Sequence, residues 1–504
     1  MSSSAEASQR VLRDALQSII DNPKAVVLTA VIGLVVLYVI DSIRIWYRLS
    51  HIPGPFLAGF STFWMMKESF KGEQPYAFQR ANEKYGSLVR VGPNELVTDD
   101  AQLLRRMMAA RSSYTRGPYN LFSTRDEHAH KKLRNKMAAG YSGKENPSLE
   151  WSVDAQISNL VTLLEIRYLS TEKEYRPVDF AEKAQFFTLD VISDLAFGEA
   201  FGYLEKDEDV FDFIAITRSY FPVAMIMSSL PMVVDILHSR LFNGLLPKET
   251  DKLGFGAFIG VAKKKVAERF EPNAEPRADM MGSFIKNGLS QEQASRESLL
   301  NVVAGSDTTA TTIRMVMLCL LSNPVAYRKL QEEIDTGIKN RTISSPISDA
   351  EARKLPYLQA IIQEGLRIKV PAAGPLFKQV PDGGDYINGK FIPGGTQIGI
   401  SPFSVYHSKE IFGQDAGIFR PERWLNADPA RLEVMSDTAG LVFSSGKWQC
   451  IGKPVAIMEL NKVFVELFRR FDFSIVQPEK PLNITNAGVW IMENFSVRVT
   501  QREW

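Results

Sequence analysis

One long apolar run near the amino terminus stands apart from the amphipathic patterns that follow it. Residues 25–40 read AVVLTAVIGLVVLYVI, with no charged residue. A membrane-spanning helix needs about 20 apolar residues, and Ile43, Ile45 and Trp46 extend the apolar character past Asp41. We therefore expect a transmembrane anchor over residues 25–46, preceded by an amino-terminal segment of residues 1–24.

Basic and proline-rich positions follow this run. Arg44 and Arg48 would place the next part of the chain in the cytosol. A cleaved signal peptide is disfavoured because no small-residue cleavage site follows the run, and a buried core helix is the second alternative. Pro53 and Pro55 cannot continue a helix. Residues 47–56 are therefore expected to form a hinge before a single domain of residues 57–504.

Further along, most apolar residues recur at helical spacing. Helices are expected at Tyr76–Tyr85, Ala101–Met108, Glu127–Met137, Phe180–Phe197 and Leu299–Leu321. Short strands are expected at Ser87–Val91, Glu95–Thr98, Ile387–Phe391, Gln397–Ser401 and Phe473–Val476. Strands and helices do not alternate regularly along the sequence, so a doubly wound sheet is not expected. The predicted fold class is mainly α with small peripheral β-sheets, preceded by one transmembrane helix.

Composition narrows the possible chemistry. The 504 residues carry a formal net charge of +1. The sequence has no Lys/Arg tract of the kind that binds nucleic acid, so no nucleic-acid partner is expected. Cys319 and Cys450 are the two cysteines, which excludes a disulfide scaffold. The five histidines show no zinc-protease or zinc-finger spacing. Any cysteine-based metal chemistry must therefore use Cys319 or Cys450.

Cys450 lies just before an amphipathic helical run. Residues 443–453 read FSSGKWQCIGK, and Pro454 suits the first turn of a helix over Val455–Phe471. Free N–H groups at a helix start favour a thiolate there. Gly446 and Gly452 would allow a tight turn and the close approach of a flat macrocycle. An inert buried thiol is the alternative, and it is preferred for Cys319, which lies in an apolar helical run.

The helix expected at Leu299–Leu321 has an unusual centre, Ala304-Gly-Ser-Asp-Thr-Thr309. Glycine costs about 1 kcal/mol in a helix interior relative to alanine, and Asp and Thr compete for backbone hydrogen bonds. Thr308 could bond back to the Ala304 carbonyl or present its hydroxyl to a ligand. Asp307 offers an ionisable group for a proton relay. A helix kink is the structural alternative.

Together these motifs resemble the cytochrome P450 superfamily. F-x-x-G-x-x-x-C-x-G is its haem-binding loop, matched by Phe443, Gly446, Cys450 and Gly452, and A-G-x-D-T-T is its oxygen-activating helix. The resemblance implies the cytochrome P450 fold and haem b with Cys450 as the axial iron ligand. It also implies that Asp307 and Thr308 deliver protons during O2 activation, with electrons from NADPH through a reductase, and cytochrome b5 as an alternative donor.

The resemblance extends to structural and haem-contacting positions. Glu364 and Arg367 form its E-x-x-R pair, expected to bind Arg423 of Phe419-Arg-Pro-Glu-Arg-Trp424 as a structural triad. His130 and Arg134 stand where the family has W-x-x-x-R, and both are expected near a haem propionate. Trp448 replaces the family's usual Arg or His, and Lys378 replaces a propionate-binding arginine. The segments Met281-Gly-Ser-Phe-Ile285 and Gly446-Lys-Trp-Gln-Cys-Ile-Gly-Lys-Pro454 resemble the pisatin-demethylase-like group of filamentous fungi.

The same resemblance places the substrate pocket and the cellular location. The implied pocket residues are mainly apolar or small, namely Phe122, Asn301, Ala304, Ala373 and Val489. We expect a monooxygenase that hydroxylates or further oxidises an apolar terpenoid or polyketide-derived compound in fungal secondary metabolism. It would be anchored once in the endoplasmic reticulum membrane with a cytosolic catalytic domain. A haem-thiolate isomerase or dehydratase, a detoxifying demethylase and a non-catalytic haem sensor remain as alternatives.

Overall fold

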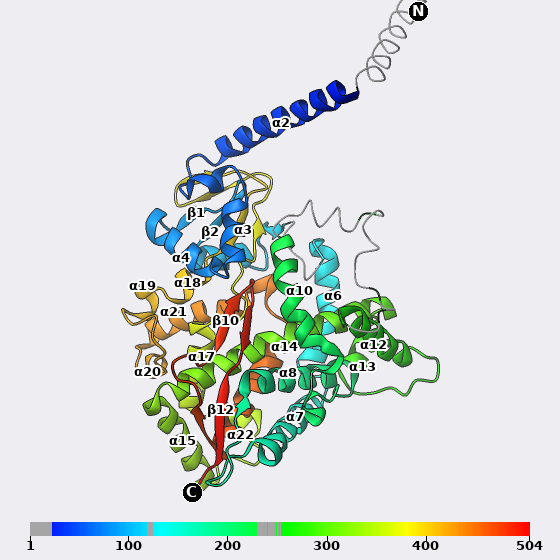
Figure 1. Cartoon of the computed structure of the whole chain (residues 1–504), viewed down its shortest axis with the longest axis vertical. Coiled ribbons are helices and arrows are strands. Elements are labelled where there is room, and N and C mark those ends of the chain that lie inside the picture. Colours follow the sequence, from blue (N-terminus) through cyan, green and yellow to red (C-terminus); the bar gives the residue numbers. More distant parts are fainter. Residues whose placement is uncertain are drawn as a thin grey trace, which may run out of the picture.

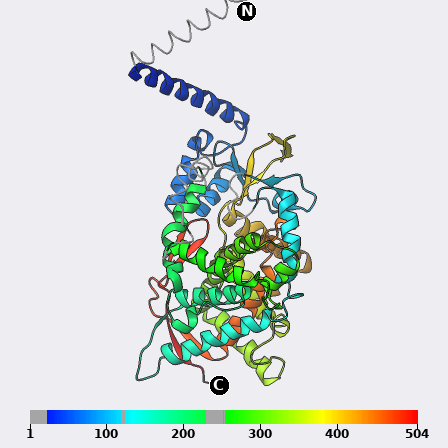
Figure 2. The same cartoon turned by 90° about the vertical axis from the view of Figure 1, so that its right-hand side faces the viewer.

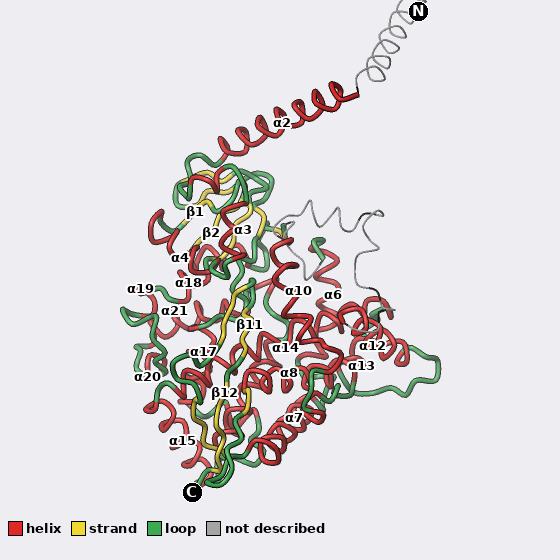
Figure 3. Tube along the Cα trace, in the orientation of Figure 1, coloured by secondary structure: helices red, strands yellow, loops and turns green. Residues whose placement is uncertain are grey.

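A helix-rich body and one projecting helix make up the described protein (Figure 1). The computed structural model describes residues 23–117, 124–228 and 254–503, with the isolated residues 239, 248 and 251. Most of the expected segment 1–24 and the predicted pocket residue Phe122 lie outside the described residues. The predicted fold class is confirmed at the level of a mainly helical protein with small sheets, which Figure 3 shows by colour.

Helices account for most of the described chain. Those in the amino-terminal half are α2 (Pro23–Arg48), α3 (Phe63–Phe70), α4 (Gln74–Tyr85), α5 (Ala101–Met108), α6 (Glu127–Tyr141), α7 (Leu149–Leu163), α8 (Phe180–Phe197), α9 (Tyr203–Lys206), α10 (Phe213–Ser228) and α12 (Gly254–Arg269). The later helices are α13 (Met280–Lys286), α14 (Gln291–Leu321), α15 (Pro324–Lys339), α16 (Asp349–Ala352), α17 (Pro356–Ile368), α18 (Pro402–Tyr406), α19 (Lys409–Phe412), α20 (Glu422–Leu425), α21 (Pro429–Ala439) and α22 (Lys453–Phe468).

Helix α14 runs through the core and packs on α8, α12, α17 and α22. It begins earlier than its apolar pattern predicts, because Ser290 and Gln293 form a capping box. The Gln293 N–H donates to Ser290 Oγ at 3.2 Å, and the Ser290 N–H donates to Gln293 Oε1 at 3.1 Å. These bonds satisfy donors that a helix start otherwise leaves unpaired. The cap gives the central helix a defined first turn.

Four small sheets surround the helices. The strands are β1 (Leu88–Arg90), β2 (Glu95–Thr98), β3 (Thr115–Arg116), β4 (Val178–Asp179), β5 (Lys378–Gln379), β6 (Asp385–Ile387), β7 (Lys390–Ile392), β8 (Gln397–Ile400), β9 (Phe471–Ile475), β10 (Asn483–Asn486), β11 (Trp490–Glu493) and β12 (Ser496–Gln501). The largest sheet has the order β1-β2-β8-β5-β3, with β2 and β8 parallel. A second joins β4, β12 and β9, and two hairpins pair β6 with β7 and β10 with β11.

The single strand expected at Ile387–Phe391 is wrong, since these residues belong to a hairpin. Strand β6 pairs with β7 in antiparallel register, with Ile387 opposite Lys390. Between them Asn388 and Gly389 have φ values of 49° and 75°. An Asn-Gly pair favours this tight turn because both residues tolerate left-handed backbone conformations. The local turn residues therefore override the apolar pattern.

Helix α2 projects from the body in both views (Figures 1 and 2). Its carboxyl end is held by Arg90, whose guanidinium donates to the carbonyls of Trp46 at 3.0 Å and Ile45 at 3.2 Å. Trp46 stacks on Phe60 with ring centroids 5.9 Å apart. At Gly54 a Cβ atom would lie 2.1 Å from the Arg90 carbonyl oxygen. The proline-rich segment is therefore packed closely on β1.

Membrane-span criteria select one bent pair of helices. Among residues 23–117, 124–228 and 254–503, no single helix meets the criteria for crossing a membrane. The pair α14 and α15, bent by 107°, meets them by length and composition only.

Candidate functional site

The cysteine loop lies between two short 3₁₀ turns and helix α22. The turns span Gly440–Phe443 and Gly446–Trp448, and α22 begins at Lys453. The Cys450 N–H donates to the Phe443 carbonyl at 2.7 Å, which closes the loop. Gly446 has a φ of 56°, and a Cβ there would lie 2.0 Å from the Met108 carbonyl oxygen. This close approach requires glycine at position 446.

Helix α22 starts close to the Cys450 sulfur. Burial raises the pKa of the Cys450 thiol, whereas the backbone N–H groups of Gly452 and Lys453 act to lower it. A Cβ at Gly452 would lie 3.9 Å from the sulfur, so glycine leaves space beside it. A metal cation at the sulfur would favour the thiolate, because a coordinating thiol loses its proton. The helix start then supports the ligand in its charged form.

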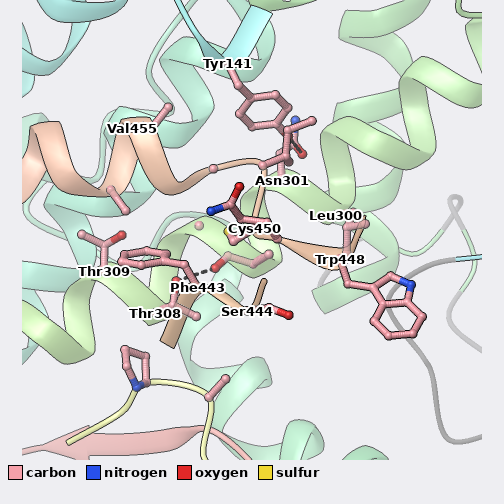
Figure 4. A pocket seen from close by; sticks show the side chains of 18 of the residues that line it. Tyr141, Leu300, Asn301, Thr308, Thr309, Phe443, Ser444, Trp448, Cys450 and Val455 are labelled. Atoms are coloured by element: carbon pink, nitrogen blue, oxygen red, sulfur yellow. Dashed lines mark hydrogen bonds between the residues drawn. The ribbon is translucent and has the colours of Figure 1, made fainter. Parts of the chain in front are cut away.

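Cys450 opens onto a cavity of about 440 Å³ between α14, α6 and α22. Its walls are largely apolar, with Phe443 beside the cysteine and Val455 on α22. In Figure 4, Cys450 lies centrally, with Tyr141 and Asn301 to one side and Thr308 to another. The thiol side chain is exposed to this space. A site of this size can enclose a flat organic group that contacts the sulfur.

One face of α14 contributes polar and small residues to the cavity. Glu297, Asn301, Ala304 and Thr308 recur at helical spacing, with Gly305 among them. Thr308 Oγ1 donates to the Ala304 carbonyl at 2.8 Å, which is one of the two geometries expected from the sequence. At Gly305 a Cβ would lie 3.0 Å from Ile192. This glycine therefore brings α14 close to α8.

Asp307 is directed away from this face. Its carboxylate pairs with the Arg314 guanidinium at 3.1 Å, and the cavity lining excludes it. Arg314 is fully buried and also donates to the Ala181 carbonyl and to Gln185 Oε1 of α8, each at 2.8 Å. Burial raises the pKa of Asp307, and Arg314 opposes that shift. Consecutive helical residues point about 100° apart, so the structure separates the two residues that the sequence analysis paired.

Helix α6 supplies basic groups at another part of the wall. His130 and Arg134 both line the cavity, as does Arg116 of β3. Arg116 Nη2 lies 2.7 Å from His130 Nε2, which makes that ring nitrogen an acceptor. Burial and the nearby Arg116 lower the pKa of His130 from its usual 6.5 to about 4. His130 is therefore neutral at pH 7, and the positive charge at this wall belongs to the arginines.

Trp448 occupies the centre of a cation cluster. Its indole N–H donates to Glu127 Oε2 at 3.0 Å. The cations of Lys447, Lys378 and Arg116 lie 4.5, 4.8 and 5.8 Å from the ring. Cation–π contacts of this kind stabilise a cation over an indole face. The position therefore gathers positive charge around an aromatic ring instead of presenting a cation itself.

Two predicted cofactor-binding residues do not line the cavity. Lys378 Nζ donates to the Leu376 carbonyl at 3.0 Å, and burial and Arg116 lower the pKa of Lys378 to about 8. Gly446 instead allows the cysteine loop to pack closely against the Met108 carbonyl, as described above. Arg116 is the cavity-lining cation that the motif comparison passed over. Its signal in the sequence is an arginine directly before Gly117-Pro118 and near His130 and Arg134.

The structure supports a haem-sized ligand at this site. One thiol, apolar walls and the two arginines Arg116 and Arg134 suit a flat macrocycle that carries a central metal and peripheral carboxylates. Phe443, Trp448 and Gly452 also line the cavity. The donor set fits haem, and the predicted iron ligand Cys450 is the cavity's cysteine.

The predicted pocket residues divide into two groups. Asn301 and Ala304 line the cavity, and Asn301 Oδ1 accepts a hydrogen bond from the Tyr141 hydroxyl. Ala373 is completely buried and does not line it. Its neighbour Ala372 does, and Ala372 forms an isolated bridge with Val489, which itself lies outside the lining. The prediction that Ala373 lines the pocket is therefore wrong, and its neighbour Ala372 lines it instead, because alternate residues of an extended segment face opposite sides.

The predicted structural triad is brought together in the core. Glu364 Oε1 lies 2.7 Å from Arg367 Nη2 and 2.9 Å from Arg423 Nε, and all three side chains are buried. Trp424 Nε1 and the Arg420 N–H also donate to the carboxylate, each at 2.9 Å. Burial acts to raise the pKa of Glu364, but the two guanidiniums hold it below its ordinary value.

Comparison with known proteins places this site in context. The family model described as Cytochrome P450 matches residues 53–499. Cytochrome P450 monooxygenase ABA1 of Pyricularia oryzae is 41% identical to this chain, and the match covers 97% of this chain and 99% of the relative. Cytochrome P450 monooxygenase aba1 of Botryotinia fuckeliana is 40% identical, with coverages of 90% and 92%. Cytochrome P450 monooxygenase cicH of Emericella nidulans is 29% identical, with coverages of 91% and 95%.

Replacing Glu364 by Gln should destabilise the protein strongly, because buried Arg367 would lose its carboxylate partner and Arg423 would keep only the partly exposed Asp415 at 3.1 Å. The expected loss in the free energy of unfolding is about 3–5 kcal/mol, measured by denaturant titration. Glu422→Gln is the matched control, since Glu422 pairs with the partly exposed Lys329 and should cost under about 1 kcal/mol. Equal losses in the two variants would contradict the structural role of Glu364.

Proposed function

Because the chain belongs to the cytochrome P450 family and is a cytochrome P450 monooxygenase, we propose that it binds haem b through the Cys450 thiolate and inserts one oxygen atom from O2 into a largely apolar small molecule. The opening of Cys450 into the cavity lined by the Ala304–Thr308 face of α14 carries this proposal. Electrons would come from NADPH through cytochrome P450 reductase, with cytochrome b5 as an alternative donor. Fungal relatives named as monooxygenases support a role in fungal secondary metabolism.

The chain's own groups have separable tasks in this proposal. Bound haem would supply oxygen activation, and a thiolate ligand increases electron density at its iron. Arg116 and Arg134 would bind the haem carboxylates, because guanidinium groups pair well with carboxylates. Thr308 would hold a proton at Oγ1 on the cavity face of α14. Asp307 does not face the cavity, so any effect of Asp307 on proton delivery would act through its ion pair with Arg314.

Carbon monoxide binding to the reduced protein tests the thiolate. The wild-type chain should show the Soret shift of a thiolate-ligated haem, and Cys450→Ala should lose it. Cys319→Ala is the matched control, because Cys319 does not line the cavity, and it should keep the wild-type spectrum. A thiolate signal in Cys450→Ala would refute the assignment. NADPH consumption by the reductase-coupled enzyme then separates a monooxygenase from an isomerase, dehydratase or sensor.

The cavity favours an apolar substrate with one polar end. Most of its lining is apolar, but Glu297 and Asn301, one turn apart on α14, and Tyr141 of α6, which donates to Asn301, form a polar part of its wall. Glu297 makes no hydrogen bond or ion pair with the residues that the structure describes. Burial raises the pKa of Glu297. A substrate hydroxyl could therefore donate to Glu297 while the remaining carbon skeleton contacts the apolar walls.

A matched ligand pair tests this polarity. Farnesol and the hydrocarbon farnesene differ in one hydroxyl, and binding of each is measured from the spin-state shift in the absorption spectrum. Glu297→Leu should weaken farnesol binding relative to farnesene by about tenfold, the loss expected for a hydrogen bond to a charged or partly charged group. The exposed Glu292→Leu on the same helix should leave the ratio unchanged. An unchanged ratio in Glu297→Leu would exclude this role.

Helix α2 supports an anchor in the endoplasmic reticulum membrane. A helix of 26 residues rises about 39 Å, which exceeds the roughly 30 Å hydrocarbon core of a bilayer. Its apolar side chains are exposed on several sides, including Leu28 at 60%, Ile32 at 54% and Leu37 at 64%. Exposed apolar surface of this extent favours contact with lipid. Arg44 and Arg48 at the body side favour a cytosolic catalytic domain.

Deleting residues 2–44 should release the protein from membranes washed with alkaline carbonate, whereas the full chain should stay in the pellet. Residues 45 and 46 are retained because their carbonyls bind Arg90. A cytosolic domain also predicts that the N-x-S/T sequons at Asn340, Asn483 and Asn494 carry no glycan. Retention of the truncated protein in the pellet would refute the anchor, and sensitivity to endoglycosidase would refute the orientation.

A further inference from the structure

Helices α8 and α14 pack along a seam, and they lie side by side in Figure 1. Four residues of α8 recur at helical spacing and share the face that meets α14: Ala181, Gln185, Thr188 and Ile192. Arg314 donates to the first two of these, as described above. Ile192 lies against Gly305, and Thr188 donates to the Ser306 carbonyl. The seam therefore holds α14 on both sides of Thr308.

Thr188 supplies the seam with a completely buried hydroxyl group. Its Oγ1 lies 2.5 Å from the Ser306 carbonyl oxygen of α14, and 3.1 and 3.2 Å from the carbonyls of Gln185 and Ala184 in its own helix. A hydroxyl has one proton to donate, and a threonine in a helix can donate it to a carbonyl one turn earlier. The nearest carbonyl here belongs to the other helix. Valine would fill the same space without burying a hydroxyl, so packing alone does not explain threonine at this position.

The Ser306 carbonyl lies on the side of α14 that faces α8. Ser306 is 1% exposed, whereas Ala304 and Thr308 line the cavity. In an α-helix the carbonyl of residue 306 also accepts from the N–H four residues later, at Ala310. A carbonyl oxygen has two lone pairs and accepts both bonds. The Thr188 hydroxyl therefore holds α14 from outside without breaking the helix.

The same turn of α14 is weakly held from within. Gly305 costs about 1 kcal/mol of helix stability relative to alanine, and a Cβ there would lie 3.0 Å from Ile192. Thr308 Oγ1 bonds back to the Ala304 carbonyl at 2.8 Å, and contacts of this kind tend to bend a helix. The position of this turn therefore depends on its contacts with α8.

We propose that Thr188 is a positioning residue, whose hydroxyl holds the Ala304–Thr308 turn of α14 against α8 and so sets the place of the Thr308 hydroxyl in the cavity. This inference rests on the proposed monooxygenase function, in which Thr308 serves the reacting oxygen. Thr188 is not among the described residues that line the cavity, so it acts through α14. Loss of its hydroxyl releases the turn from α8 and changes the distance between the Thr308 hydroxyl and a ligand bound beside Cys450.

Amide hydrogen exchange of the full chain tests the bond between the helices without turnover. Thr188→Val keeps the shape of the side chain and removes the hydroxyl, whereas Thr188→Ser keeps the hydroxyl and removes a methyl group. Exchange of the amides of residues 306–310 should be about tenfold faster in Thr188→Val, as expected for one lost hydrogen bond, and near wild type in Thr188→Ser. A packing role predicts the reverse order. That reverse order, or equal exchange in all three proteins, would overturn the proposal.

The stretching frequency of carbon monoxide bound to the reduced, haem-loaded chain tests the effect on Thr308, because this frequency responds to nearby hydroxyl dipoles. Thr188→Val should shift the band in the same direction as Thr308→Ala, and Thr188→Ser should keep the wild-type band. Ser193→Ala is the matched control, since Ser193 is a buried hydroxyl of α8 that accepts from the Phe201 N–H at 3.0 Å. This variant should lower the melting temperature and keep the band.

A wild-type band in Thr188→Val, or an equal shift in Ser193→Ala, would rule out the positioning role. If the wild-type chain showed no thiolate-type Soret band, the proposed function would fail instead. The order of amide exchange in the two Thr188 variants would then still decide whether this hydroxyl holds the turn.

Discussion

Desolvation of ionisable groups is the constraint on which this structure depends. A cysteine sulfur, several guanidiniums and several carboxyl groups lie in or beside one largely apolar core. Each charged form must find a partner, because an unpaired ion in a protein interior loses its hydration without compensation. A Cys450 thiolate would meet this requirement through the start of α22 and a coordinated metal ion. Glu364 meets it through Arg367 and Arg423.

The same constraint sorts the residues of the central helix. Asp307 pairs with Arg314 on the α8 side, and the cavity face carries Glu297, Asn301, Ala304 and Thr308. An unpaired carboxylate beside a metal-bound ligand would alter the local field, whereas a hydroxyl bonded to the Ala304 carbonyl adds no charge. Helix α14 therefore has a buried ion pair on one side, and on the other it presents the Thr308 hydroxyl and the Glu297 carboxyl to the cavity. The division follows from the angular spacing of helical residues.

Much of the fold was predictable because its signals are local. The helices at Ala101–Met108 and Phe180–Phe197 have the expected bounds, and the cysteine loop precedes a helix as its proline and glycine residues indicate. Other features depend on contacts between distant segments. The position of Asp307 is set by Arg314 and its bonds to α8, and Arg116 becomes part of the site only when β3 packs near α6. Glu459 is one of two glutamates on α22, and its lack of a hydrogen-bond partner at Oε2 emerges only from packing.

The cations around the Trp448 indole bear on the reduction potential that a bound haem would have. Three basic side chains surround it, Arg116, Lys378 and Lys447, and Glu127 is the carboxylate that accepts from its ring nitrogen. A surplus of positive charge beside a redox centre stabilises the reduced form, and the effect is larger where little water screens it. If haem binds here, the electrostatic bias at its iron would be spread over several side chains instead of one cation. The midpoint potential of a bound haem would then depend on the whole cluster, and each single substitution in it would shift that potential only in part.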